Sequence, residues 1–296
     1  MRVSSKINAL DISWGKFKLA LSNRTYIMGV LNRTPDSFSD GGQFMKEADA
    51  AERAFEMASV GADIIDIGGE STRPGAEPVT IDAELDRTIP VIKRIARNLD
   101  IPISIDTHKS EVAREALKNG AAIINDVTGL RGDSGMAKVA LDFDVPVVIM
   151  HMKGTPRTMQ LNPQYGSLIK DILAGIKESI EMAKNAGIDE NKIIIDPGIG
   201  FGKTAEHNLK ILNNLELFKR LKRPILIGVS RKSYIISTLK DNRIDNTDIE
   251  ASGRLMGTVS SCAISILKGV NILRVHDVKE MVQASRVADA IVRSGK

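Results

Sequence analysis

Short runs of apolar residues recur along the chain, each followed by polar or glycine-rich residues and then by a segment with apolar residues at helical spacing. Continuous Val/Ile runs are typical of strands buried on both faces, as in a parallel sheet. Helical spacing indicates a helix that packs one face against that sheet. The pattern predicts eight strand–helix repeats, with strands at 26–31, 64–67, 103–105, 122–124, 147–150, 193–196, 225–229 and 272–275.

The intervening segments predict helices at 48–60, 82–98, 110–118, 135–143, 168–186, 207–221, 231–239, 250–268 and 278–293. Eight parallel units of this size close into a (β/α)8 TIM barrel of the α/β class, whose active site lies at the C-terminal ends of the strands. A doubly wound open sheet is the alternative, but no G-x-G-x-x-G follows the first strand. We expect a single domain over 26–296, after a lead-in at 1–25 that is irregular or forms a small hairpin closing the bottom of the core.

Composition narrows the class of protein. Of the 296 residues, 43% are hydrophobic and 26% are charged, which is typical of a soluble globular protein. The net charge of +4 comes without a basic block, so we expect small-molecule substrates and no nucleic acid. No apolar run is long enough to cross a membrane. The single Cys262 excludes an internal disulfide, and a cytoplasmic location is expected.

The stretch 193–204, I-I-I-D-P-G-I-G-F-G-K-T, joins a buried strand to a carboxylate and a glycine-rich turn. Such a turn lets the backbone approach whatever Asp196 holds. Its end, G-K-T, also matches the phosphate-binding loop of nucleotide hydrolases. Pro197 stands where that loop needs its first glycine, and proline lacks the N–H that would face phosphate. We therefore disfavour a nucleotide loop.

Polar residues at the strand ends fall into two chemical groups. Asp106, Asn125 and Asp196 offer acceptors that would grip a planar heterocycle carrying N–H donors. The second group would hold a diphosphate or a carboxylate, and it consists of Arg73, Lys203, Lys232, Arg274 and His276. The alternative for Asp106 and Asp196 is that each caps the helix that follows it.

The segment after the first strand is long and rich in Gly and Ser, which suggests a lid. Asn32, Asp36 and Asp40 supply hard oxygen atoms there, and Mg²⁺ commonly takes one or two protein oxygens and completes its shell with water and phosphate. A solvated surface loop is the alternative. The segment 68–75 is a second candidate lid and adds Ser71, Thr72 and Arg73.

Four histidines have different expected roles. His151 and His276 end strands and face the candidate cleft, whereas His108 and His207 begin helices and are expected to cap them. The sequence contains no H-x-H or H-E-x-x-H, which disfavours a zinc hydrolase.

Taken together, several motifs resemble one family over the whole chain after residue 26. I-M-G-V-L-N-x-T-P-D-S-F-S-D-G-G at 27–42, D-I-G-G-E-S-T-R-P-G at 66–75 and I-D-P-G-I-G-F-G-K at 195–203 resemble dihydropteroate synthase. Shorter motifs occur in the same order: S-I-D-T at 104–107, I-N-D-V at 124–127, M-H-M-K-G-T-P at 150–156, G-V-S-R-K-S at 228–233 and R-V-H-D-V at 274–278.

The resemblance implies a barrel that joins 6-hydroxymethyl-7,8-dihydropterin diphosphate to p-aminobenzoate, and a homodimer. It implies Mg²⁺ near Asn32 and catalytic roles for Asp106, Asp196, Lys232, Arg274 and His276. The implied pterin diphosphate site consists of Thr72, Asp106, Asn125, Asp196, Lys232, Arg274 and His276. The implied p-aminobenzoate site consists of Phe38, Thr72, Arg73, Pro74, Lys232 and Ser233.

Two residues depart from the family's pattern. Arg33 stands where a small β-branched residue is common, and it either touches diphosphate or points away from the site. Because Arg33 follows Asn32 directly, the loop after the first strand can differ in geometry from that of the family. The sulfonamide sensitivity of the family therefore does not carry over to this sequence. Tyr234, where Phe is common, is a milder difference. The alternatives are a corrinoid-linked methyltetrahydrofolate methyltransferase and a non-catalytic pterin-binding protein.

Overall fold

Eight parallel strands form one sheet in the computed structural model, which describes residues 10–34, 47–73, 75–241 and 254–295. Their order around the sheet is β8-β7-β6-β5-β4-β3-β10-β9. Their bounds are β3 Tyr26–Asn32, β4 Ile64–Gly68, β5 Ile103–Asp106, β6 Ile123–Asp126, β7 Val147–Met150, β8 Ile193–Asp196, β9 Leu226–Ile227 and β10 Ile272–Val275. The predicted strands are thus confirmed, with the seventh shorter than expected.

The sheet closes on itself between its first and last strands. Ile195 of β8 forms a parallel bridge with Ile225, just before β9, and the Ile195 N–H donates to the Pro224 carbonyl at 2.9 Å. Closure leaves every strand with neighbours on both sides, and the strands β4 to β8 are buried along their whole length. This explains the continuous Ile/Val runs, because one face of each strand fills the barrel and the other meets the helices. The (β/α)8 prediction is confirmed.

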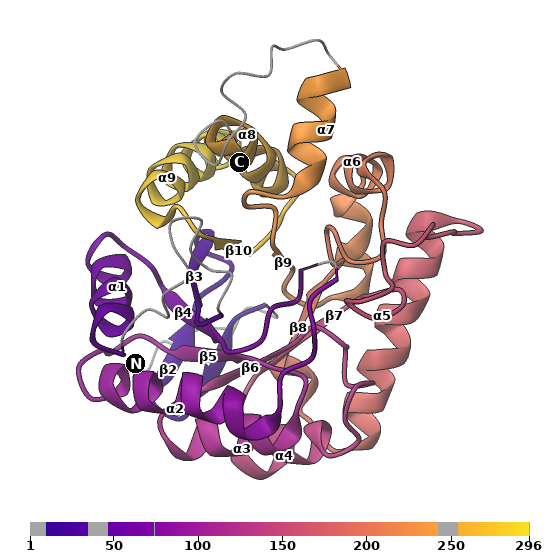
Figure 1. Ribbon diagram of the computed structural model, residues 1–296. Helices are drawn as coiled ribbons and strands as arrows, with labels where there is room; N and C mark the ends of the chain where they lie inside the picture. Colours follow the sequence, from indigo (N-terminus) through magenta and orange to yellow (C-terminus); the bar gives the residue numbers. More distant parts are fainter. Residues whose placement is uncertain (1–9, 35–46, 74, 242–253, 296) are drawn as a thin grey trace, which may run out of the picture.

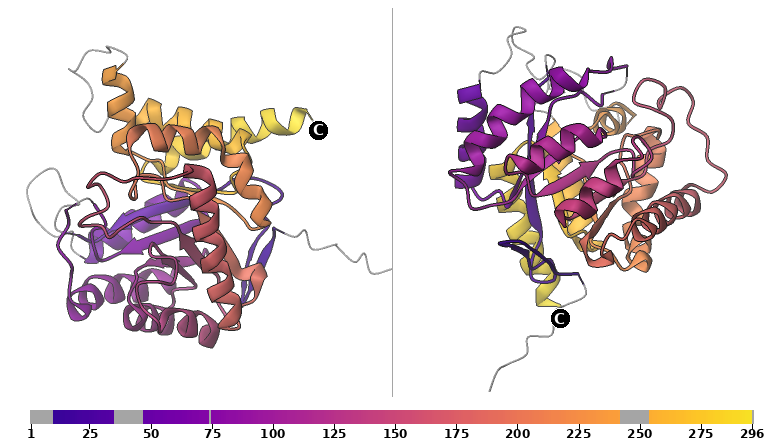
Figure 2. Two further views of the ribbon diagram at one scale, coloured as in Figure 1. Left: turned by 90° about the vertical axis from the view of Figure 1, so that its right-hand side faces the viewer. Right: turned by 90° about the horizontal axis from the view of Figure 1, so that it is seen from below.

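The helices form a ring outside the strands (Figures 1 and 2). They are α1 Glu47–Ser59, α2 Ile81–Ala96, α3 Ser110–Lys118, α4 Met136–Phe143, α5 Leu168–Asn185, α6 Ala205–Asn213, α7 Ser233–Asp241, α8 Arg254–Leu267 and α9 Val278–Ser294. Residues 250–253 of the helix predicted at 250–268 lie outside the described residues. Of the helices that the structure describes, none has the length and apolar content needed to cross a bilayer.

The single helix predicted at 207–221 is wrong. The segment contains α6 and a separate 3₁₀ helix, η3 Leu215–Leu221. They meet at Asn214, whose backbone has φ −122° and ψ 22° and whose side-chain amide donates to the Lys210 carbonyl at 2.8 Å. An asparagine that bonds nearby backbone in this way competes with the helical hydrogen bonds.

The lead-in contains the small hairpin that the sequence allowed. Strands β1 Ile12–Trp14 and β2 Phe17–Leu19 pair antiparallel. The Trp14 indole N–H donates to the Ala122 carbonyl at 2.8 Å, directly before β6. The hairpin therefore covers the N-terminal end of the barrel, opposite to the predicted site.

Candidate active site

The sheet register brings four of the predicted site residues to the C-terminal end of the barrel. Gly68 pairs with Asn32 on one side and with Asp106 on the other. Asp106 in turn pairs with Asn125, and Asp196 pairs with Met150 of the neighbouring strand. Side chains that are distant in sequence thus share one end of the barrel, as the pattern of strand ends predicted.

Arg274 crosses this end of the barrel from β10 to β4 and β5. Its Nε donates to Asp66 Oδ2 at 2.7 Å, and its Nη2 donates to Asp106 Oδ2 at 2.6 Å. The Asn125 amide also donates to Asp66 Oδ2, at 3.2 Å. Burial alone would lower the pKa of Arg274, but the two carboxylates raise it above its ordinary value. Asp66, Asp106, Asn125 and Arg274 therefore form one hydrogen-bonded set.

Asp66 is a site residue that the sequence reasoning missed. It lies inside β4, is fully buried, and holds both Arg274 and Asn125. The signal was a lone carboxylate within the apolar run I-I-D-I-G, since an ionised group in a buried strand requires a partner. Asp66 lies in the middle of its strand, so a search restricted to strand ends does not find it.

The two strand-end aspartates differ from ordinary carboxylates because both are buried. Burial raises the pKa of Asp106 to about 7, against the lowering effect of Arg274. Burial also raises the pKa of Asp196 to about 6, although the Gly198 N–H and the cations Lys232 and Lys203 favour its charged form. Each carboxyl group can therefore change protonation near neutral pH.

The glycine-rich turn after β8 wraps its backbone around Asp196. The Gly198 N–H donates to Asp196 Oδ1 at 2.7 Å. Gly198 has φ +74°, and a Cβ there would lie 2.0 Å from the His151 carbonyl oxygen. Only glycine combines that conformation with so close an approach. Asp196 thus accepts a bond from its own turn rather than from the first turn of α6, which Thr204 caps.

Lys232 lies above Phe201 of the same turn. Its Nζ is 4.5 Å from the centroid of the Phe201 ring. Burial, together with repulsion from Arg274, lowers the pKa of Lys232 to about 8. Phe201, which is buried, was not among the predicted site residues. The sequence feature that could have identified Phe201 is that it is the single aromatic residue in the turn after β8.

Ser230 holds both the backbone and the ring of His276. The His276 backbone N–H donates to Ser230 Oγ at 3.2 Å, and the same Oγ lies 3.1 Å from His276 Nδ1. The hydroxyl can give its own proton to Nδ1, which leaves the ring proton on Nε2. Burial and the charge of Arg274 lower the pKa of His276 to about 3. His276 is therefore a neutral hydrogen-bond donor at pH 7.

Lys203 differs from its predicted role at the barrel mouth. It is buried, and its ammonium donates to the carbonyl oxygens of Phe201 at 2.9 Å and of His151 at 3.2 Å. Burial lowers the pKa of Lys203 to about 7, although Asp196 opposes this. Its Nζ also lies 3.1 Å from His151 Nδ1, so Lys203 joins the loops after β7 and β8 instead of offering a free cation to an anion.

Asn32, at the end of β3, is the residue at which the sequence predicts Mg²⁺. A Cβ built on Gly68 would lie 3.6 Å from both Asn32 Oδ1 and Asp106 Oδ2, so the two oxygens flank the same glycine. Within the described ranges, no cluster of three or more His, Cys, Asp or Glu side chains could hold a metal ion. One amide oxygen still fits Mg²⁺, because the ion commonly completes its shell with water and phosphate.

The remaining predicted residues follow β3, β4 and β9 in the sequence. Thr72 is half-buried and Arg73 is exposed on the second loop, and Ser233 is exposed at the start of α7. The second loop contacts the loop after β7 through the Gly75 N–H, which donates to the Pro156 carbonyl at 3.4 Å. Phe38, Pro74, Asp36 and Asp40 lie outside the described residues.

Arg33 is affected electrostatically by charged groups of two helices. Its charged neighbours are Glu47 of α1 and Arg87 of α2, and burial lowers its pKa. Its Nη1 is buried without a hydrogen-bond partner among the described residues. Neither charged neighbour belongs to the strand-end set.

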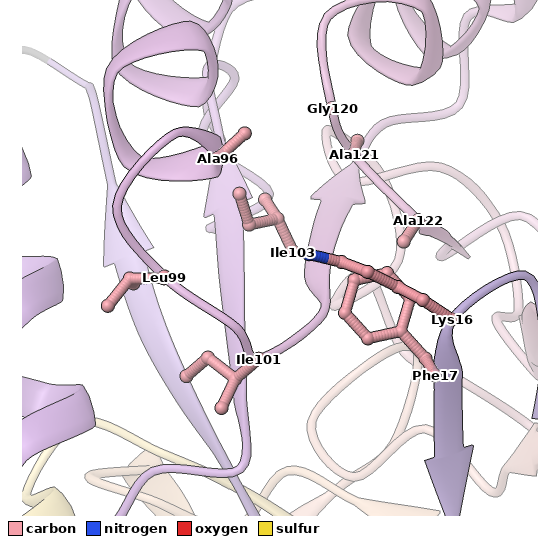
Figure 3. Close-up of a pocket in the computed structure, with 9 residues that line it drawn as sticks. All are labelled: Lys16, Phe17, Ala96, Leu99, Ile101, Ile103, Gly120, Ala121 and Ala122. Carbon is pink, nitrogen blue, oxygen red and sulfur yellow. The ribbon is translucent and has the colours of Figure 1, made fainter.

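Other predicted roles are structural. Thr204 and His207 form a capping box at the start of α6, as expected for that histidine. Cys262 is buried, and burial raises the pKa of its thiol to about 12. A hollow of about 280 Å³ lies at the other end of the barrel, where Lys16 and Phe17 of the hairpin face Ile103 and Ala122 (Figure 3). It contains none of the strand-end residues.

Comparisons with known proteins agree with this geometry. Residues 28–276 match the family described as pterin binding enzyme. The chain is 48% identical over 280 residues to a dihydropteroate synthase of Clostridium beijerinckii, covering 94% of this chain and 98% of that protein. A dihydropteroate synthase of Yersinia pestis, solved in a sulfonamide drug complex, has a TM-score of 0.89 at 41% identity, covering 96% of this chain and 100% of that one.

A second solved structure is Xanthomonas albilineans dihydropteroate synthase with 4-aminobenzoic acid. Its TM-score is 0.83 at 40% identity, and the match covers 93% of this chain and 95% of that one. The family match runs from β3 to just past β10, so it includes the ends of all the strands that carry the site.

Proposed function

The chain belongs to the family of pterin-binding enzymes, and we infer that it acts as a dihydropteroate synthase. It is a transferase of folate biosynthesis that condenses 6-hydroxymethyl-7,8-dihydropterin diphosphate with p-aminobenzoate and releases 7,8-dihydropteroate and diphosphate. The observation that carries the inference is the hydrogen-bonded set of buried Asp66, Asp106 and Asn125 with half-buried Arg274 at the C-terminal end of the barrel.

We assign the pterin ring to the acceptors at the strand ends. The ring presents amino and ring N–H donors along one edge, and Asp106, Asn125 and Asp196 present acceptors from β5, β6 and β8. Buried carboxylates bind such donors strongly, because hydrogen bonds to charged groups are about twice as strong as neutral ones. Lys232 supports the same ring from the side of β9.

We assign the diphosphate to Arg274, His276 and Thr72. Arg274 bonds Asp66 and Asp106 through Nε and Nη2, and its charge and its Nη1 donors suit phosphate oxygens, as does the Nε2–H of His276. Asn32 would hold Mg²⁺, which when bound supplies positive charge to the leaving group. Support for the metal is limited to the Asn32 oxygen beside Gly68 and Asp106.

We assign p-aminobenzoate to the side of the mouth formed by the second loop and the start of α7. The proposed residues are Phe38, Thr72, Arg73, Pro74, Lys232 and Ser233. Arg73 and Lys232 supply cations for the carboxylate, and the Phe201 ring beneath Lys232 supplies a flat apolar surface.

No protein nucleophile is needed for this reaction. The C–O bond to diphosphate breaks, and its electrons leave with the diphosphate. The p-aminobenzoate nitrogen forms the new C–N bond to the methylene carbon and then releases one proton to the departing diphosphate or to water. Asp106 and Asp196 stabilise positive charge that develops on the pterin, while Arg274 stabilises negative charge on the leaving group. Fixed groups in a buried site do this without reorganising during the step.

A coupled assay tests the proposal. Purified protein is given the pterin diphosphate, with and without p-aminobenzoate and Mg²⁺, and both diphosphate and dihydropteroate are measured. We expect equal amounts of both products only when all three are present. Diphosphate release distinguishes this reaction from methyl transfer and from non-catalytic pterin binding. A protein that binds pterin but releases no diphosphate would refute the assignment.

We further propose that two copies associate through α8 and α9, which lie side by side on the outside of the barrel (Figures 1 and 2). Large apolar side chains are exposed there: Met256 67%, Ile264 48% and Leu267 65% on α8, and Val287 62% and Ile291 65% on α9. Their spacing by three, four or eight residues places them along one stripe of each helix. A stripe shared by two packed helices suits a self-complementary interface with a second copy.

We also propose a cytoplasmic location. The support is Cys262, a single free thiol buried in α8, which is compatible with a reducing compartment.

A further inference from the structure

An ion cluster lies behind the second loop, outside the residues assigned to substrates. The Lys109 ammonium lies 2.6 Å from Glu70 Oε2 and 2.5 Å from Glu84 Oε2. The Glu84 side chain is fully buried, and those of Glu70 and Lys109 are 12% and 16% exposed. Burial alone would lower the pKa of Lys109, but the two carboxylates raise it above its ordinary value. Lys109 therefore stays charged, and it joins the two glutamate side chains.

The cluster connects three parts of the barrel. Glu70 belongs to the loop after β4, Glu84 to α2, and Lys109 stands directly before α3, three residues after Asp106. The second carboxylate oxygen of Glu70 accepts the Val79 N–H at 3.2 Å, so Glu70 also ties the two ends of its own loop together.

Further contacts hold the base of the same loop on α2. The Gly69 carbonyl accepts a bond from Arg87 Nη1 at 2.8 Å. A Cβ on Gly69 would lie 2.8 Å from Thr88 Cγ2 and 2.9 Å from Glu84 Cγ, so the backbone rests directly on that helix. Thr72 and Arg73 follow Glu70 by two and three residues. The base of the loop is fixed, while its exposed Arg73 faces solvent.

We propose that Lys109 is a positioning residue for the p-aminobenzoate part of the site. Through Glu70 it fixes where Thr72 and Arg73 stand relative to Asp106, and so relative to the bound pterin. The proposal rests on the function inferred above. Lys109 bonds Glu70 and Glu84 at the same time, so its geometry joins the loop to both neighbouring elements.

The test removes Lys109 together with the fully buried Glu84, and it leaves Glu70, which is 12% exposed and has His108 Nδ1 at 3.7 Å from its Oε2. Lys109→Met alone would strand Glu84, and breaking a buried pair is strongly destabilising, whereas replacing both members with apolar residues of similar size is often tolerated. The double variant Lys109→Met with Glu84→Met is therefore compared with Lys109→Arg, which keeps the charge. The matched control is Lys118→Met on α3, where an exposed lysine pairs with Glu115.

In the double variant we expect the KM for p-aminobenzoate to rise at least tenfold, while kcat and the KM for the pterin diphosphate stay within threefold. Lys109→Arg and Lys118→Met should stay within threefold in all three constants. Glu70→Gln keeps the Lys109–Glu84 pair and should also raise the KM for p-aminobenzoate. This variant replaces the double variant in the test if the double variant does not fold. An unchanged KM for p-aminobenzoate, or a parallel rise in both KM values, would overturn the proposal.

Hydrogen–deuterium exchange gives a readout that does not depend on turnover. Exchange at residues 69–73 should increase in the double variant and not in Lys118→Met. If the wild-type protein formed no dihydropteroate, the inferred function would fail, yet the exchange result would still decide whether Lys109 holds the loop. Equal exchange in both variants would exclude that role.

Discussion

Arg274 Nη2 lies 2.6 Å from Asp106 Oδ2, which joins the last strand of the barrel to its third across the active end. The same guanidinium binds Asp66 at 2.7 Å, so one cation serves two buried carboxylates. Asp106 has a pKa of about 7 in this environment, and Arg274 is the group that opposes its protonation. Arg274 is thus placed both to meet a leaving diphosphate and to keep the pterin acceptor charged.

Replacing Arg274 with Met should impair both stability and activity. The substitution leaves Asp66 and Asp106 buried without their cation, and losing one partner of a buried pair costs about 3–5 kcal/mol. Activity should fall by about one and a half to four decades, the equivalent of 2–5 kcal/mol for a truncated charge pair. Denaturant unfolding and kcat/KM for the pterin diphosphate measure the two effects. Arg293→Met, at the exposed end of α9, is the control.

The Asp196→Asn variant should lose activity while keeping its fold. The amide presents donors where the pterin ring also presents donors, and it weakens the bond from the Gly198 N–H. The expected loss in kcat/KM is about one and a half to four decades, from 2–5 kcal/mol for a buried charged hydrogen bond. Asp142→Asn, at an exposed position of α4, should behave as wild type. An Asp196→Asn variant within threefold of wild type would exclude the proposed role.

Most of the barrel could be predicted because burial on both faces leaves a direct trace in the sequence. The runs of Ile and Val predict β4 to β8, and the polar residues at the ends of these runs identify Asp106, Asn125 and Asp196 as candidate site residues. Asp66 escaped because its partner, Arg274, is 208 residues away and only the closed barrel brings them together.

The direction of a side chain is a second limit of sequence reasoning. Lys203 follows a strand end in sequence, but its ammonium turns back to the carbonyls of His151 and Phe201. Nothing in the pattern G-F-G-K distinguishes that orientation from one toward a substrate. The break at Asn214 is similar, because apolar spacing continues through it while the backbone leaves the helix.

The rate should depend on pH in a bell-shaped manner, with a maximum between about 7 and 8. The pKa values of Asp196 and Asp106 are about 6 and 7, so raising the pH through this range creates the charged acceptors and increases kcat/KM. The pKa of Lys232 is about 8, so raising the pH further removes its charge and decreases the rate.

Lys232→Arg provides the check on this profile. A guanidinium keeps its charge throughout, so the alkaline limb should move beyond the measurable range while the acid limb stays in place. An alkaline limb that remains near pH 8 in this variant would assign it to another group.

Introducing charge on the α8–α9 stripe should separate the proposed dimer. The double variant Leu267→Glu with Ile291→Glu places two carboxylates at side chains that are 65% exposed, so the fold of one copy should be unaffected. Light scattering should then report a single chain of 32.2 kDa instead of twice that mass. Met182→Glu, an exposed substitution on α5, should leave the mass unchanged. A wild-type protein that is already monomeric at high concentration would contradict the proposed interface.

Arg33→Val should have little effect on catalysis, although Arg33 adjoins Asn32. Its charged neighbours are Glu47 and Arg87 on the surrounding helices, and its Nη1 is buried without a partner among the described residues. Valine removes that unpaired donor, so the free energy of unfolding should stay the same or increase. The KM for the pterin diphosphate should stay within threefold, whereas Asn32→Ala, the adjacent control, should raise the Mg²⁺ concentration needed for half-maximal rate. A tenfold rise in the KM of Arg33→Val would instead mean that Arg33 turns toward the diphosphate when substrate binds.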